Sequence, residues 1–136
     1  MIVKEFISET NKNQMISILL KHYKVGSVKV KQKSMKNHAH YNVDTGTLEL
    51  STRYRVIKPN KIKEFLITIL HEIYHAIDAK KYGWKKFKDM YEMEMNIQIS
   101  KGKDKYDDNK YEIEAEQFGQ KNHQKWYNTF KKQDLF

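Results

Sequence analysis

One apolar stripe, over residues 61–82, constrains the fold of this chain more than any other feature. Hydrophobic side chains recur there every three or four residues, which places them on one face of an α-helix. They are Ile62, Phe65, Leu66, Ile69, Ile73 and Ile77. Pro59 and Asn60 precede the stretch and Gly83 follows it, so both ends carry helix-boundary signals. The pattern predicts a long helix with one buried face.

Shorter patterns predict the remaining elements. Apolar residues at helical spacing mark three more helices, and alternating apolar and polar residues mark three strands. The predicted helices cover residues 11–24, about 85–97, and a stretch from about Asn109 to beyond Trp126, and the predicted strands cover residues 28–31, 39–43 and 47–51. The last two strands flank Asp44-Thr45-Gly46, a turn sequence that predicts a hairpin. We therefore expect an α+β fold in which a small antiparallel sheet packs with helices.

The composition limits the kinds of site that the chain can build. Its 136 residues are enough for one core, so we expect a single domain over residues 1–136. The sequence contains no cysteine, which excludes disulfides and every thiolate metal site, so any metal must bind His, Asp or Glu. Because we find neither a signal peptide nor an apolar stretch of about 18 residues, we expect a cytoplasmic protein without a membrane-spanning helix.

The net charge of +9 has two interpretations. A basic chain attracts polyanions, which favours nucleic acid or an acidic protein as a partner. However, Arg53 and Arg55 are the only arginines, and specific recognition of phosphate favours the arginine side chain. An excess of lysine is also typical of compositional bias, which we favour while keeping nucleic acid as an open alternative.

His71, Glu72 and His75 form the motif with the clearest chemistry, and they lie in the middle of the predicted helix over residues 61–82. Side chains four residues apart in a helix lie one turn apart on the same face, so both imidazoles can reach one metal ion. Glu72 is about 100° around the helix from His71, where it can act on a water molecule without binding the metal. This His-Glu-x-x-His arrangement predicts a zinc site with a catalytic glutamate.

A catalytic zinc site needs a third protein ligand, and an acidic segment downstream supplies three candidates. Glu112, Glu114 and Glu116 stand at alternate positions, so they cannot all lie on one helix face. Glu112 and Glu116 share a face with the small residue Gly119, which allows another helix to approach closely. We expect Glu112 to bind the metal and Glu116 to orient a histidine, with Glu114 and Glu116 as alternative ligands. A capping box with Asn109 would instead direct the Glu112 side chain to the backbone.

The two motifs together resemble the gluzincins, and most closely the ImmA/IrrE-type metallopeptidases. The matching segments are His71-Glu72-Ile73-Tyr74-His75-Ala76 and Glu112-Ile113-Glu114-Ala115-Glu116-Gln117-Phe118-Gly119. The family also has a small antiparallel sheet before its active-site helix, so the resemblance spans about residues 28–119. Tyr74 departs from the glycine that the family often has. A lesser resemblance, to SprT-like proteases, rests on the segment from Tyr82 to Phe87, although Tyr82 replaces the histidine that is their third ligand.

The resemblance implies a zincin-like domain with zinc endopeptidase activity. It implies that His71, His75 and Glu112 hold Zn²⁺ and that Glu72 is the catalytic base. Because some family members act on helix-turn-helix repressors, the implied partner is a protein or peptide substrate, including a repressor-like regulator. The competing hypothesis is a basic interaction module without enzymatic activity. Such a module would bind nucleic acid or an acidic protein and keep a structural or vestigial zinc site.

Three other residues have two interpretations each. His38 and His40 are two residues apart near a predicted strand, which suits either a second metal site or an ordinary polar surface. Asp78 lies one turn beyond His75, where it either positions a histidine or pairs with a lysine.

Substrate binding adds further expectations. We expect strand 47–51 to form an exposed edge that binds the substrate backbone, and the polar loop 100–110 to be mobile or to gate the cleft. Several tyrosines are candidates for stabilising an oxyanion, and the sequence does not choose among them. They are Tyr74, Tyr82, Tyr91, Tyr106 and Tyr111.

Overall fold

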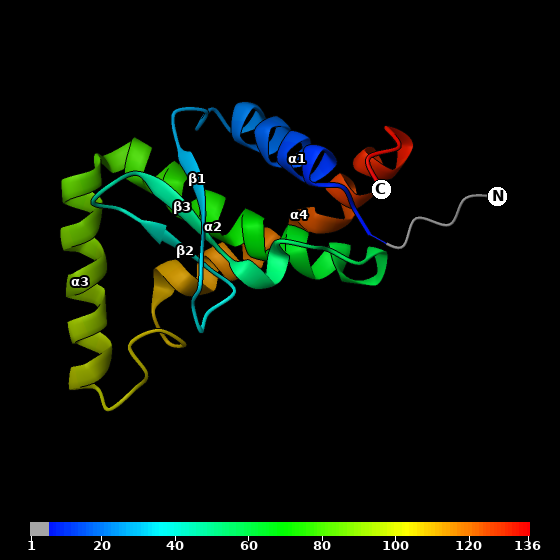
Figure 1. Cartoon of the computed structure of the whole chain (residues 1–136). Coiled ribbons are helices and arrows are strands. Elements are labelled where there is room, and N and C mark those ends of the chain that lie inside the picture. The colour runs from blue at the N-terminus through cyan, green and yellow to red at the C-terminus, as the bar shows by residue number, and fades with distance from the viewer. Residues whose placement is uncertain (1–5) are drawn as a thin grey trace.

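The structure is a computed structural model that describes residues 6–136. This part of the chain forms helices around a small sheet, so the predicted α+β class is confirmed (Figure 1). The helices are α1 (Glu9–His22), α2 (Ile62–Tyr82), α3 (Trp84–Ser100) and α4 (Lys110–Lys132), and the strands are β1 (Lys29–Lys33), β2 (Ala39–Asn42) and β3 (Thr47–Ser51). Short 3₁₀ turns at Thr52–Tyr54 and Pro59–Lys61 lead into α2. None of the described helices has the length and apolar character to cross a membrane.

Local capping sets the helix ends, which differ from the predicted ends by only a few residues. Ser8 begins α1 earlier than predicted, because its side chain accepts a hydrogen bond of 3.1 Å from the backbone N–H of Asn11. Gly83 ends α2, as predicted, with a φ of 87° that other residues rarely adopt. The chain turns there directly into α3, which stands across the end of α2 in Figure 1.

The sheet has the strand order β1-β3-β2. β2 pairs with β3 in antiparallel fashion, which confirms the predicted hairpin. β1 pairs with β3 in parallel, so the sheet is mixed and the prediction of an antiparallel sheet is wrong. Alternation of apolar and polar residues shows which face of a strand is buried, but it does not identify the neighbouring strand.

The central position of β3 also contradicts the prediction that Thr47–Ser51 is an exposed edge. Residues 48–51 are buried, and β3 is paired on both of its sides. β2 packs against α2, and it is the edge strand on that side of the described sheet. The edge that faces the His-Glu-x-x-His helix is therefore Ala39–Asn42.

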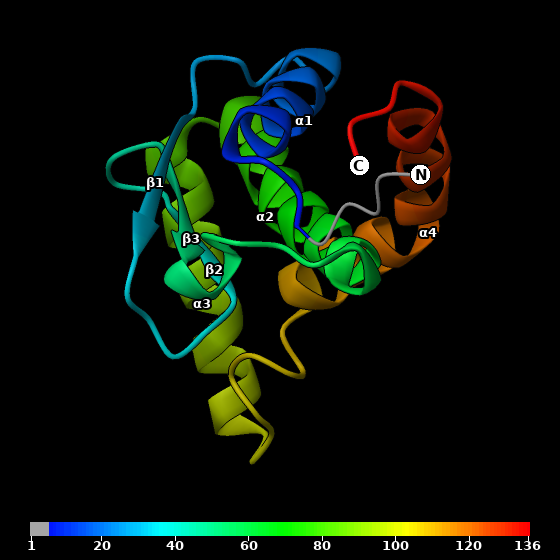
Figure 2. The same ribbon diagram turned by 45° about the vertical axis from the view of Figure 1, so that its right-hand side comes forward.

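α2 lies between the sheet and α4 (Figure 2). Most of its predicted apolar stripe is buried, including Phe65, Leu66, Ile69 and Ile73, each with no exposed surface. Burial of a large apolar side chain contributes about 1.5–3 kcal/mol, so this face fixes the rotation of the helix. The polar face of α2 is thereby held toward α4 and β2.

Gly119 allows α4 to pack closely against α2. A Cβ atom at this position would lie 2.8 Å from the carbonyl oxygen of Ile67 and 3.3 Å from its Cγ2. Ala115, one turn earlier on the same face, is fully buried. The predicted close approach of this small-residue face is confirmed, and it brings the first turn of α4 beside the polar face of α2.

Gly119→Ala is expected to destabilise the fold by about 1–3 kcal/mol, the usual cost of overpacking a core. The gain in helix propensity of about 1 kcal/mol offsets part of this loss. Urea denaturation measures the free energy of unfolding. Gly26→Ala is the matched control, because a Cβ atom there meets nothing within 4 Å. Equal free energies of unfolding for the two variants would contradict the role assigned to Gly119.

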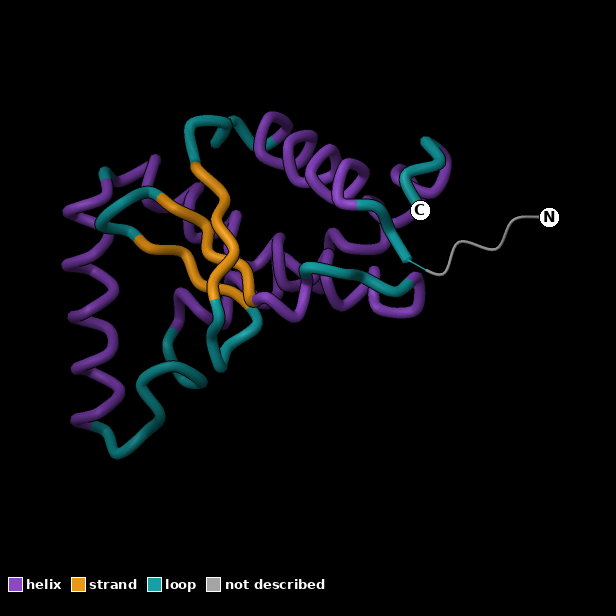
Figure 3. The backbone as a smooth tube through the Cα atoms, in the orientation of Figure 1, coloured by secondary structure: helices purple, strands orange, loops and turns teal. Residues whose placement is uncertain are grey.

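A loop over residues 101–109 connects the far end of α3 to the start of α4 (Figure 3). Asp104 organises it, because its Oδ1 accepts hydrogen bonds of 2.8 Å from the backbone N–H groups of Tyr106 and Asp107. The loop therefore has local structure of its own, and both its mobility and its role as a gate stay predictions.

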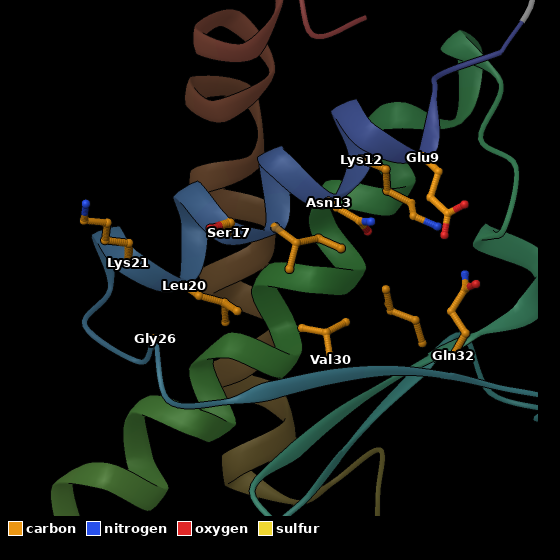
Figure 4. Close-up of a pocket in the computed structure, with 11 residues that line it drawn as sticks. Glu9, Lys12, Asn13, Ser17, Leu20, Lys21, Gly26, Val30 and Gln32 are labelled. Atoms are coloured by element: carbon orange, nitrogen blue, oxygen red, sulfur yellow. The ribbon is translucent and has the colours of Figure 1, made fainter.

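A hollow of about 660 Å³ lies between α1 and β1 (Figure 4). Leu20 of α1 and Val30 of β1 line it, together with Lys12. Lys12 is buried, and its ammonium group donates a hydrogen bond of 3.1 Å to the backbone oxygen of Tyr54. This hollow is lined by neither of the motif histidines, so it is separate from the candidate metal site.

Candidate metal site

His71 and His75 lie one turn apart on α2, and Glu112 faces both of them from the first turn of α4. The two imidazole rings have centroids 5.1 Å apart. One carboxylate oxygen of Glu112 lies 3.4 Å from His71 Nε2, and the other contacts His75 Nε2. One potential ligand atom from each residue can be chosen so that all three lie within 4.8 Å of one another. Within residues 6–136, this is the one such group of three.

Asn109 explains how Glu112 becomes available to the histidines. Its side chain caps α4 by accepting a hydrogen bond of 2.9 Å from the backbone N–H of Tyr111. Its own backbone N–H donates to the backbone oxygen of Tyr106 at 3.2 Å. The predicted N-cap is confirmed, but the reciprocal bond of a capping box is absent here because that N–H already has a partner. The Glu112 side chain therefore points to α2 and not to the backbone.

Glu94 fixes the start of α4 from the side of α3. It is buried, and its Oε2 accepts hydrogen bonds of 2.8 Å from the backbone N–H of Lys110 and 3.1 Å from Gln98 Nε2. A carboxylate at a helix N-terminus is also favoured by the helix dipole. We did not predict this residue, because the sequence gives no signal that separates a buried glutamate from the exposed acidic residues around it.

The two alternative ligands occupy different positions. Glu116 lies on the same face as Glu112, and its Oε2 lies 3.0 Å from His71 Nδ1. His71 therefore has Glu112 at one ring nitrogen and Glu116 at the other, which fixes the orientation of the ring. Glu114 is exposed, and it accepts a hydrogen bond of 3.4 Å from the hydroxyl of Tyr74, away from the group of three.

His75 and Asp78 each have a buried side-chain atom without a hydrogen-bond partner in the described structure, namely Nδ1 and Oδ2. Leaving such an atom unpaired costs about 1–3 kcal/mol. The two residues are three positions apart on one helix, so a hydrogen bond between these atoms would satisfy both. The alternative prediction, that Asp78 pairs with a lysine, is not met among the ion pairs of the described residues.

The charges in this group are strongly coupled. Burial alone would lower the pKa of His71, but hydrogen bonding to Glu112 and the charges of Glu72 and Glu112 raise it to about 9. Burial alone would raise the pKa of Glu112, but its hydrogen bonds with His71 and His75 hold it well below the usual range. Without a metal, a protonated imidazole thus balances the carboxylate. Two imidazole nitrogens and one carboxylate oxygen are also the donor set of many catalytic zinc sites.

Glu72 is set apart from the three potential ligands. The residue is only 8% exposed, and its carboxylate has no hydrogen bond with the described residues. Burial raises its pKa, although the nearby His75 and His71 lower it. A carboxylate with a raised pKa and no fixed partner is suited to accept and release a proton.

Two of the candidate tyrosines lie at the group: Tyr106 lines a hollow with His71 and Glu112, and Tyr91 contacts His75. Its ring lies edge-on to His75 with centroids 6.2 Å apart, and it stacks on Tyr111 at the same separation. Burial, the charge of Glu112 and a hydrogen bond with Glu112 raise the pKa of Tyr91. The phenol therefore stays protonated and is available as a hydrogen-bond donor. The sequence could not select it, because α3 carries no motif.

The pair of histidines at positions 38 and 40 does not form a second metal site among the described residues. His38 lies just before β2, and both of its ring nitrogens have partners. Nδ1 lies 2.8 Å from the hydroxyl of Tyr54, and Nε2 lies 2.7 Å from Nη1 of Arg53. His38 is therefore part of a protein hydrogen-bond network.

Comparisons with known proteins assign no family to this geometry. No family model, no curated protein and no solved structure matches the chain. The resemblance to the gluzincins therefore depends on the motif residues themselves.

Proposed function

We propose that this protein is a zinc-dependent endopeptidase with a zincin-like domain. The observation that carries the proposal is the convergence of His71, His75 and Glu112, with Glu72 buried beside them and free of a hydrogen-bond partner. A structural zinc site normally has four protein ligands and does not need such a carboxylate. Three protein ligands, with the carboxylate of Glu72 beside them and not bound to the metal, are typical of a catalytic zinc site.

The protein supplies metal ligands, a base and positioning groups. Bound to His71, His75 and Glu112, zinc would supply a Lewis acid that polarises water and the peptide carbonyl. Glu72 accepts a proton from the attacking water and donates it to the leaving amine as the C–N bond breaks. Glu116 holds the ring of His71 in place, as carboxylates commonly do for histidine ligands. Tyr91, whose interaction with Glu112 raises its own pKa, would supply a protonated phenol beside His75.

The substrate backbone is expected to pair with β2. This strand, Ala39–Asn42, packs on α2 and is an edge of the described sheet. Ala39 lines a hollow together with His71 and Glu72, so a peptide added along β2 passes the metal site. This replaces the predicted docking strand, which is central in the sheet. A protein substrate in the cytoplasm, including a repressor-like regulator, fits the motif resemblance.

Metal removal tests the proposal directly. The purified protein is expected to carry about one zinc per chain and to hydrolyse unstructured peptides internally. Dialysis against a chelator should abolish hydrolysis, and added zinc should restore it. Metal analysis and mass spectrometry of the products measure the two properties. A protein that binds zinc but cleaves no peptide or partner protein would contradict the proposal.

The basic interaction module is the second candidate, and one observation favours it. Lys29, Lys31 and Lys33 are exposed on one face of the edge strand β1. Such a face attracts polyanions, and their binding would weaken steeply as the salt concentration rises. Salt-dependent nucleic acid binding without any peptide hydrolysis would support this module.

A further inference from the structure

A hollow of about 530 Å³ extends from the candidate metal site along α2. At the metal end it is lined by His71, Glu72 and Glu116. At the other end it is lined by Glu64 of α2 and by His38. Glu64 lies eight residues before Glu72, or about 12 Å along the helix axis, so the hollow has the reach for a long side chain.

A chain of hydrogen bonds fixes the carboxylate at the far end. Arg53 can only donate, so His38 accepts at Nε2, at 2.7 Å, and its Nδ1 carries the hydrogen. That Nδ1–H donates to the Tyr54 hydroxyl at 2.8 Å. Burial raises the pKa of Tyr54 to about 12, so the hydroxyl keeps its proton and donates to Glu64 Oε1 at 3.2 Å. Glu64 is therefore a carboxylate held in place before any ligand arrives.

The lining of this hollow is acidic, although the chain as a whole carries a net charge of +9. Three carboxylates line it together with the two histidines His38 and His71, and no lysine or arginine does. Glu72, one of the three, is more than nine-tenths buried and has no hydrogen-bond partner. Two groups of the protein already lie close to Glu64, with Lys61 Nζ at 3.6 Å from Oε2 and His38 Nδ1 at 3.3 Å from Oε1. The side chains of Lys61 and Glu64 are 60% and 41% exposed, so their ion pair is weak and a substrate cation can compete with it.

Building on the proposed peptidase function, we propose that this hollow is a specificity pocket for a lysine or arginine side chain of the substrate next to the cleaved bond. Glu64 binds the charged end of that side chain, and the alkyl stem lies along α2. A free α-amino group is the other cation that a peptide offers. It has no alkyl stem of its own, so a peptide terminus bound at the metal site would not extend along α2 to Glu64.

Peptides that differ at one position test this inference. A fixed sequence carries lysine, or the uncharged straight-chain residue norleucine, at each position in turn, with the N-terminus either acetylated or free. Mass spectrometry identifies the bonds cleaved by the zinc-loaded protein, and kcat/KM is compared for lysine and norleucine. The wild type is expected to prefer lysine by about 10-fold or more, the range of a hydrogen bond to a charged group.

Variants then assign the preference to Glu64. Glu64→Gln should reduce the lysine-to-norleucine ratio to about one, and Lys61→Ala, which removes the competing ammonium, should increase it. Glu114→Gln removes a carboxylate outside the hollow and should keep the wild-type ratio. The pocket proposal would be wrong, and the peptidase proposal unaffected, in any of three cases. The wild type could cleave lysine and norleucine peptides equally, Glu64→Gln could keep the preference for lysine, or cleavage could require a free N-terminus. Zinc-loaded protein that cleaves none of the peptides would count against the peptidase and the pocket together.

Discussion

Glu72→Gln is expected to keep the zinc of the wild-type protein and to lose its peptide hydrolysis. Glutamine has the shape of glutamate, and Glu72 is not one of the three potential ligands, so metal binding should remain. The amide cannot accept the proton of the attacking water. General base catalysis contributes about a hundred- to ten-thousand-fold, so the decrease in kcat should be of that size.

The measurement pairs zinc content with kcat on the same protein sample. Thermal unfolding of the variant shows that the fold is kept. Because the carboxylate of this mostly buried residue has no hydrogen-bond partner in the described structure, its replacement leaves no other group unpaired. If Glu72→Gln retained the full biological activity of the wild type, the peptidase proposal would be wrong, and the basic interaction module would be the better account.

The sequence predicted α2 well because one simple constraint dominates that helix. The apolar residues of its stripe can be buried together only if the segment is helical, and its ends carry Pro59 and Gly83. The same periodicity placed His71 and His75 on one face. The expectation that Glu112 faces the histidines came from helical spacing combined with Gly119, which has no side chain and which the structure confirms as a point of close helix contact.

The sheet was predicted less well, for a physical reason. Each strand has the alternation of a half-buried strand, but the order β1-β3-β2 depends on contacts between segments that are distant in sequence. A hairpin signal connects only β2 and β3. Nothing in the local sequence indicates that β1 pairs in parallel with β3 and makes it the central strand.

The residues around the site that the sequence missed, or named without being able to choose them, share this dependence on tertiary contacts. Glu94 and Tyr91 stand on α3, a helix without a recognisable motif, and their roles appear only when α3 lies beside the start of α4. In the sequence, Glu64 has the appearance of an ordinary exposed glutamate in the first turn of a helix. Its hydrogen bond from Tyr54 joins it to a network that begins before β2.

Glu112→Gln is expected to weaken zinc binding itself, whereas Glu114→Gln should bind zinc like the wild type. The two glutamates are on the same helix, two residues apart, and the same charge is removed in both variants. Only Glu112 faces His71 and His75, and Glu114 contacts the Tyr74 hydroxyl instead. Loss of a residue that only positions a ligand reduces metal affinity about 10- to 100-fold, so loss of the ligand itself should exceed 100-fold. Competition with a chromophoric chelator measures the affinity.

Thermal unfolding measures zinc binding by the Glu112→Gln and Glu114→Gln variants in an independent way. A ligand that binds only the folded state stabilises it by about 4 kcal/mol at a free concentration of a thousand times Kd. Added zinc should therefore raise the Tm of the wild type and of Glu114→Gln, but raise that of Glu112→Gln much less at the same concentration. If the two variants exchanged these behaviours, Glu114 would be the ligand and α4 would have to turn on its axis. Gly119 makes that rotation costly, because it would bring a larger side chain against the backbone of Ile67.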